Sequence, residues 1–148
     1  MERPTGVTVI SVLHFIFAGF CLLGALFAFL AGAVLMQMIR SAAAGGPTGG
    51  QALAAGLGAI LGVVFIVGLG LHLLLGIGLW KLANWARILE IVLLALALVF
   101  GVFGLLVAFM HFHAGILLFR LIIMAIQLWI VVYLFKPHVK QAFGATSL

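Results

Sequence analysis

Long apolar runs alternate with short polar breaks along this chain. Four runs, at about 7–38, 53–80, 85–110 and 114–135, each exceed or match the roughly 20 residues that a helix needs to cross a bilayer. Helices are expected rather than strands because lipid offers no hydrogen-bond partner to exposed backbone groups. The pattern therefore predicts an all-α, polytopic membrane protein, an antiparallel bundle of four transmembrane helices.

The breaks predict short connections with one exception. A flexible outer loop is expected at 41–52, where alanine, glycine, proline and threonine dominate. The last apolar run, 114–135, is followed by a short cytoplasmic tail at 136–148. In this tail the side chains of Val139 and Phe143 are expected to enter the membrane surface. The length fits a single transmembrane domain over 1–148.

Small and polar residues recur at alternating spacings of three and four in three of the runs, and less regularly in 53–80. We call these rows the small-residue faces. They allow helix backbones to approach closely in left-handed packing, while the opposite faces of Leu, Ile, Val and Phe suit lipid. The faces comprise Ser11, His14, Ala18, Cys21, Ala25, Ala28 and Gly32; Gly58, Gly62, His72 and Gly76; Glu90, Leu94, Ala97, Gly101, Gly104, Ala108 and His111; and His113, Leu117, Arg120, Met124, Gln127, Val131 and Leu134.

Composition strengthens the membrane assignment. The chain is 68% hydrophobic and 6% charged, whereas a soluble domain carries about 25% charged residues. The pI near 10.4 does not indicate nucleic-acid binding, because the few cations flank apolar runs and form no basic cluster with interleaved aromatic residues. The expected partners are the lipid bilayer and other membrane protein subunits, not nucleic acid.

The positions of the cations predict an orientation. Most Lys and Arg residues fall at one end of the runs and Arg40 falls at the other. The positive-inside rule then predicts an integral membrane protein with both termini cytoplasmic. The residues at the predicted cytoplasmic end are Arg3, Lys81, Arg87, Lys136 and Lys140.

Each run carries one polar side chain at a similar predicted depth: His14, His72, Glu90 and Gln127. At a rise of about 1.5 Å per residue, these four lie about 8–14 Å from the cytoplasmic ends of their helices. All four are on small-residue faces, which predicts a polar layer inside the bundle or against a partner. Arg120 lies nearer the outer end and is expected to reach outward, to headgroups, helix-end carbonyls, Gln37 or a partner chain.

His14 and His72 are candidate cofactor ligands. Two imidazoles on facing helices can hold the iron of haem b, and one imidazole can hold the magnesium of a chlorophyll-type pigment. Gly68 and Gly76 flank His72 and would leave room for the edge of a macrocycle. The structural alternative is that both histidines donate hydrogen bonds across the bundle to the rest of the polar layer, with the glycines serving helix packing.

Other chemistry receives less support from the residues. His14, His72 and Glu90 are a possible transition-metal set, but no His-x-x-x-His or Glu-x-x-His spacing accompanies them. Glu90 is the one acid inside a run and could couple proton transport, but local pairing with Arg87 or with a histidine is the favoured explanation. Known four-helix multidrug exporters carry their acid in the first helix, where this chain has His14. The chain has two acidic residues and no recognisable set of residues for nucleophilic catalysis, so we do not expect an enzyme.

Three segments carry a resemblance: the opening Arg3–Thr8, the hairpin Gly78–Arg87 and the ending Tyr133–Lys140. Together they resemble a group of small prokaryotic four-helix membrane proteins of unassigned function. The resemblance implies four spanning helices in the cytoplasmic (inner) membrane of a prokaryote, and it brings no activity to any residue. The leading expectation is a non-catalytic accessory subunit of a larger membrane complex. The alternatives are a haem- or chlorophyll-binding subunit of a respiratory or photosynthetic complex using His14 and His72, and a small proton-coupled transporter using Glu90.

Overall fold

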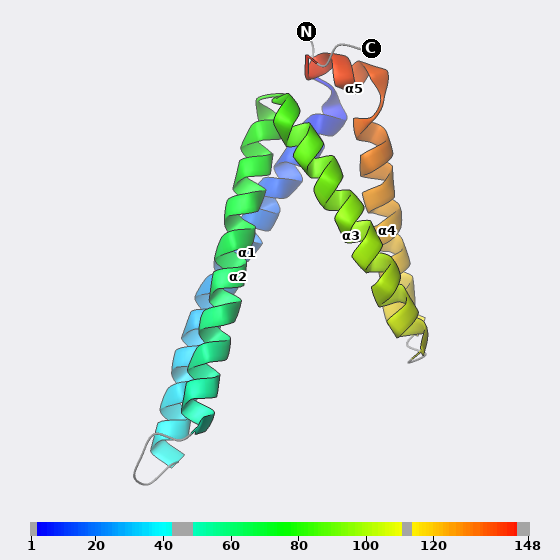
Figure 1. The fold of residues 1–148 in the computed structure, drawn as a ribbon. Helices are drawn as coiled ribbons and strands as arrows, with labels where there is room; N and C mark the ends of the chain where they lie inside the picture. The colour runs from blue at the N-terminus through cyan, green and yellow to red at the C-terminus, as the bar shows by residue number, and fades with distance from the viewer. Residues whose placement is uncertain (1–2, 43–48, 111–113, 145–148) are drawn as a thin grey trace. The chain divides into compact units, whose positions relative to one another are not determined.

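The computed structural model describes residues 3–42, 49–110 and 114–144. This part of the chain is helical apart from short turns and contains no strand, which confirms the all-α prediction. Four helices are long and apolar enough to cross a membrane, so the arrangement indicates an integral membrane protein. In chain order the helices are α1 (Thr5–Ala42), α2 (Gly49–Trp80), α3 (Asn84–Met110), α4 (Ala114–Leu134) and the short α5 (Pro137–Ala142) (Figure 1).

The predicted bounds of the outer loop, 41–52, are wrong at both ends. α1 continues through Ala42 and α2 already begins at Gly49, while 43–48 lies outside the described residues. Extending an existing helix adds one hydrogen bond for each residue ordered, so α1 propagates beyond the last apolar position. Ser41 contributes to that last turn, because its hydroxyl donates to the carbonyl of Met38 at 2.9 Å.

A tight turn joins α2 to α3. Ala83 donates its backbone N–H to the carbonyl of Gly78 at 2.9 Å, and Leu82 takes a left-handed conformation with φ 54°. A methyl group at Gly78 would lie only 2.5 Å from the Cβ of Ala86. The absence of a side chain at Gly78 therefore lets the start of α3 lie directly against the end of α2.

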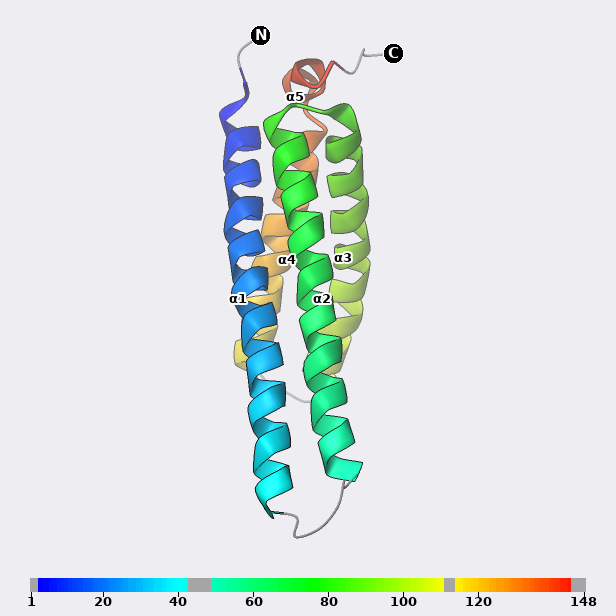
Figure 2. The same cartoon turned by 90° about the vertical axis from the view of Figure 1, so that its left-hand side faces the viewer.

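The contacts divide the chain into two compact units. The hairpin unit, Val12–Gly76, contains most of α1 and α2, and the terminal unit, Met1–Ser11 with Ile77–Leu148, contains α3, α4 and α5. Within the hairpin unit α1 and α2 run antiparallel side by side (Figure 2). Within the terminal unit α3 and α4 form the corresponding pair (Figure 1). The single-domain description stays a prediction.

The small-residue faces are the inner faces of both helix pairs. In the hairpin unit, a Cβ at Gly58 would lie 2.9 Å from the Cα of Gly32, so the two backbones touch. In the terminal unit, a Cβ at Gly101 would lie 3.3 Å from Met124. Large apolar side chains on the opposite faces are exposed, as lipid requires. The spacing pattern thus predicted the packing faces correctly. The least exposed members of the first face are Ser11, His14, Ala18, Ala25 and Ala28.

The terminal unit has a hydrophobic cluster at the end where most cations lie, and α5 is part of it. Val139 is fully buried and Phe143 is 5% exposed. The prediction that these two side chains enter the membrane surface is therefore wrong. Pro137 starts α5 in a direction that turns them onto the protein, where burial removes them from water and lipid alike. The buried members of the cluster are Val7, Ile10, Leu79, Ala86, Leu134, Val139 and Phe143.

Candidate functional site

The hairpin unit brings His14 of α1 and His72 of α2 into direct contact. Their Nδ1 atoms are 2.9 Å apart, with ring centroids 5.1 Å apart and the planes tilted by 40°. Phe17 stacks against His72 at 5.6 Å. His14 is buried and His72 is half-buried, so the pair lies on the inner side of the hairpin. The antiparallel packing of α1 and α2 thus joins two of the four residues of the predicted polar layer.

This contact constrains the protonation of both rings. A hydrogen bond between two Nδ1 atoms needs one donor and one acceptor. In the neutral pair one ring therefore carries its proton on Nδ1 and the other on Nε2. The pair can accept one further proton without losing the hydrogen bond, whereas a second would place two N–H groups opposite each other.

The same contact bears on the expected haem role. An imidazole nitrogen sits about 2 Å from the metal that it ligates, so two axial ligands lie about 4 Å apart across the iron. Nitrogens that are 2.9 Å apart and share a hydrogen bond leave no space for that ion between them. Haem ligation by both histidines would require the rings to separate. The cofactor role of His14 and His72 stays a prediction.

The glycines beside His72 pack against α1. A methyl group at Gly76 would meet the ring of Phe15 at 3.0 Å, and one at Gly68 would meet the Sγ of Cys21 at 3.2 Å. The predicted room for a macrocycle edge is therefore occupied, because Phe15 and Cys21 of α1 fill it. The alternative reading, in which these glycines serve helix packing, matches the structure.

The other polar residues of the predicted layer belong to the terminal unit. Glu90 is buried on the inner face of α3, and Gln127 is half-buried on α4. Arg120 is half-buried, and its guanidinium lies against Gly104 of α3, where any Cβ would overlap it. Arg120 therefore crosses the α3–α4 contact, whereas the sequence suggested that it reaches outward. The four-residue layer as a whole stays a prediction.

Metal ligands do not cluster in the described part of the chain. No group of three or more His, Cys, Asp or Glu side chains within 3–42, 49–110 and 114–144 is arranged to hold a metal ion. His111 and His113 lie outside these ranges, and so does any contact they make. His138 stacks edge-on against Tyr133 at 6.1 Å.

Cations at the end of the terminal unit rest on aromatic rings. Arg3 lies 4.5 Å from the ring centre of Trp80 and donates a hydrogen bond from Nη2 to the Trp80 carbonyl at 2.6 Å. Lys136 lies 5.7 Å from the ring centre of Tyr133. Cation–π contacts beside exposed tryptophans are typical of the headgroup level of a membrane. This end of the terminal unit therefore has the features of a membrane–water interface.

Arg87 differs from the other described cations because its side chain is buried. It is 8% exposed, and its Cζ lies 5.9 Å from the ring centre of Phe143. Its Nε and Nη1 atoms are buried without any hydrogen-bond partner in the described part of the chain, as is the Oδ1 of nearby Asn84. The sequence placed Arg87 at the helix end by its charge and offered it as a partner of Glu90, but nothing in the local pattern indicated that it is buried.

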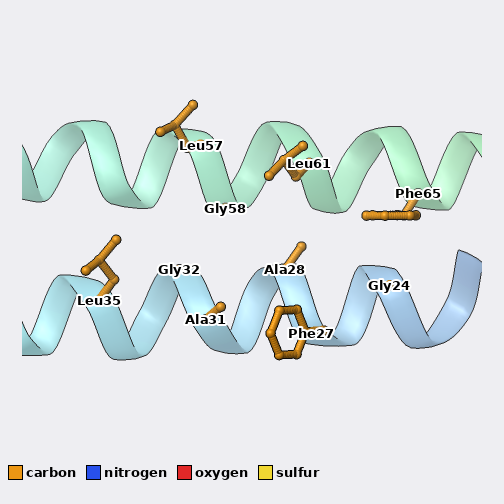
Figure 3. Close-up of a pocket in the computed structure, with 10 residues that line it drawn as sticks. All are labelled: Gly24, Phe27, Ala28, Ala31, Gly32, Leu35, Leu57, Gly58, Leu61 and Phe65. Atoms are coloured by element: carbon orange, nitrogen blue, oxygen red, sulfur yellow. The ribbon is translucent and has the colours of Figure 1, made fainter. Parts of the chain in front are cut away.

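An open apolar groove runs along the contact of α1 and α2 (Figure 3). Its volume is about 280 Å³. A second groove of about 190 Å³ shares Gly32 and Gly58 with the first. Both exist because the small-residue faces leave hollows beside the line where the backbones touch. The first groove is lined by Gly24, Phe27, Ala28, Ala31, Gly32, Leu35, Leu57, Gly58, Leu61 and Phe65.

No protein-family model, curated protein or solved structure gives a significant match to this chain.

Proposed function

We propose that this protein is a non-catalytic accessory subunit of a larger membrane complex, and that α1 and α2 dock it there. The hairpin unit presents an exposed apolar surface with an open groove between two glycine-rich helices. Close approach of helix backbones at small residues is the main route by which membrane helices associate. The proposed occupant of the groove is an apolar helix of a partner subunit.

The length of the apolar part of α1 carries this proposal. The run 7–38 has no charged residue and is about 48 Å long at about 1.5 Å per residue. A bilayer core is about 30 Å thick. Even a tilt of about 40°, the upper end of the observed range, leaves a run about 37 Å tall. Lipid chains therefore cannot cover all of it, and a protein partner can.

The groove lies on the part of the apolar surface of α1 that lipid chains cannot cover. Along α1 it extends from about 26 to 42 Å beyond Val7, and along α2 from about 22 to 34 Å beyond Trp80. Both helices thus place it across the far boundary of the hydrocarbon core. The hydrocarbon layer ends at that boundary, which favours a protein segment over lipid as the occupant.

A photo-crosslinking amino acid at Leu61 tests the proposal, with Val63 as the matched control. Both side chains are about half exposed on the same helix, but only Leu61 lines the groove. In native membranes we expect Leu61 to give a discrete adduct with another protein and Val63 to give mainly lipid adducts. Identical lipid adducts at both positions, or adducts only with a second copy of this chain, would contradict an accessory role.

Proton-coupled transport is the second candidate, because Glu90 is a buried acid in a helix that can span the membrane. Ionisable side chains in such positions commonly mark proton pathways. Under this alternative Glu90→Gln abolishes proton-driven uptake in vesicles that contain the purified protein. Equal uptake in the variant and the parent would remove the transporter hypothesis. The accessory role instead requires the Leu61 adduct whatever occupies position 90.

A further inference from the structure

We infer that Arg87 and the N-terminus of α3 form a binding site for a phosphate group, supplied by an anionic phospholipid. Two nitrogens of the Arg87 guanidinium, Nε and Nη1, are buried without a hydrogen-bond partner in the described part of the chain. A buried donor without a partner costs free energy, and more when the group is charged. The two Arg87 nitrogens therefore require a hydrogen-bond acceptor. An anionic acceptor makes the strongest hydrogen bonds to a guanidinium.

The position of Arg87 in α3 points to the same conclusion. The N-terminus of a helix carries a partial positive charge that favours anions and disfavours a cation in the first turns. The first turn of α3 contains no acidic residue, yet Arg87 lies at its end. The backbone N–H groups of Asn84 and Trp85 have no carbonyl one turn before them within the helix. An external anion would satisfy both the helix end and the arginine.

Helix geometry favours an Arg87 side chain that faces that helix end. Helical side chains lean toward the N-terminus and cover the preceding turn, which for Arg87 is the turn that begins at Asn84. Phe143, beyond the end of α5, packs on the guanidinium and holds it. Glu90 is one turn deeper in α3, and neither Nε nor Nη1 of Arg87 bonds to it. The two guanidinium nitrogens without a partner and the first amides of α3 therefore belong to the same turn of the helix.

The surroundings favour a lipid phosphate. Trp80 and Trp85 are both exposed at this end of the terminal unit, as interfacial tryptophans are, which places Arg87 at headgroup depth. Lys81 and Lys140 belong to the same unit and raise the local concentration of anions. The guanidinium can bind two phosphate oxygens at once, which an exposed lysine cannot do.

Native mass spectrometry of the full chain in mild detergent tests the site. The probes are dioleoylphosphatidylglycerol, dioleoylphosphatidylcholine and inorganic phosphate, each titrated separately. We expect retention of phosphatidylglycerol over phosphatidylcholine and a loss of about tenfold in phosphatidylglycerol affinity in Arg87→Gln, the effect of one charge-assisted hydrogen bond. The matched control is Lys136→Gln, which removes an equal charge from an exposed residue and should change affinity by less than about twofold.

A second variant keeps the test decisive if Arg87→Gln does not fold. Asn84→Asp supplies a carboxylate at the N-terminus of α3, which favours the helix and competes for Arg87. It should fold and lose phosphatidylglycerol to a similar degree. Equal losses in Arg87→Gln and Lys136→Gln, or unchanged retention in Asn84→Asp, would overturn the inference. Arg87-dependent binding of inorganic phosphate without lipid selectivity would keep the phosphate site and exclude the phospholipid as its source.

Discussion

The imidazoles of His14 and His72 hold α1 and α2 together through a polar contact in an otherwise apolar hairpin. Their Nδ1 atoms are 2.9 Å apart, and in the neutral pair the contact requires opposite tautomers on the two rings. A hydrogen bond of this kind between membrane helices contributes about 0.6 kcal/mol on average and up to about 2 kcal/mol. Losing one partner costs more than losing both, since the remaining ring keeps its desolvation penalty.

A double-mutant cycle on this pair should therefore show coupling. We expect His14→Leu and His72→Leu each to lower the free energy of unfolding by about 1–3 kcal/mol. The double variant should cost less than the sum of the two by at least about 0.5 kcal/mol. Reversible unfolding in mixed detergent, followed by circular dichroism, gives all four values. Strictly additive losses would show that the two rings do not depend on each other.

The sequence predicted which residues carry polar chemistry better than what they contact. His14 and His72 were identified from one polar side chain per run and from equal depth, and the antiparallel hairpin pairs them. Arg120 could not be placed, because its long side chain could reach either outward to the headgroups or across the α3–α4 contact to Gly104, and spacing along the chain does not distinguish the two. The burial of Arg87 was also missed, since it depends on Phe143, which lies far away along the chain and is brought near only by the position of α5.

At the scale of the helix pair, one glycine sets how closely α1 and α2 approach. A Cβ on Gly58 would lie 2.9 Å from the Cα of Gly32 and 3.1 Å from the carbonyl oxygen of Ala28. Both obstacles are backbone atoms, so a methyl group cannot be accommodated by turning a side chain. The helices would have to separate along this stretch.

Gly58→Ala should therefore destabilise the hairpin unit by about 1–3 kcal/mol, the usual cost of overpacking. Gly56→Ala is the matched control, because nothing lies within 4 Å of its added Cβ. In a helix the control should be neutral or stabilise by up to about 1 kcal/mol. Detergent-induced unfolding of the two variants distinguishes them. Equal stability would mean that the backbones of α1 and α2 do not touch at Gly58.

The runs of apolar residues predicted the bounds of α3 and α4 well. They predicted the loop between α1 and α2 and the position of α5 less well. α3 and α4 begin and end within one residue of the predicted 85–110 and 114–135. The length of an apolar run does not show where a helix ends outside the apolar layer of the membrane. For this reason the extension of α1 and α2 into the predicted loop was missed. The position of α5 depends on tertiary packing of Val139 and Phe143, which local amphipathicity alone does not reveal.

The packing of α5 gives a prediction that separates protein contact from membrane contact. Phe143 is 5% exposed and belongs to the cluster at the end of the terminal unit. Phe143→Ala should lower the free energy of unfolding by about 3–5 kcal/mol, as expected for a buried phenylalanine. Gln141→Ala, an exposed position of α5, should change it by less than about 0.5 kcal/mol. If Phe143 instead entered lipid, its substitution would weaken membrane partitioning and leave unfolding unchanged.

At the scale of the whole molecule, surface composition decides where the protein resides. Large apolar side chains are exposed along the outer faces of all four long helices, which water would not tolerate over so large an area. Charge is concentrated at the helix ends. The two helix pairs differ in length, with 38 and 32 residues in α1 and α2 against 27 and 21 in α3 and α4. Under the proposed accessory role, the longer pair is therefore the one whose apolar surface a partner subunit covers beyond the lipid.

The distribution of cations predicts how the molecule is oriented in the membrane. In a chain whose Cys21 is replaced by alanine, single cysteines at Lys81, Gln141 and Ser41 report on three exposed positions. Because positive residues are retained on the cytoplasmic side, a membrane-impermeant maleimide added to intact cells should label Ser41→Cys alone. Lys81→Cys and Gln141→Cys should react only after the membrane is opened. The inverse pattern would contradict the orientation. Labelling of Lys81→Cys and Gln141→Cys from opposite sides would contradict four spans, since α3 and α4 together must return the chain to the side where α2 ends.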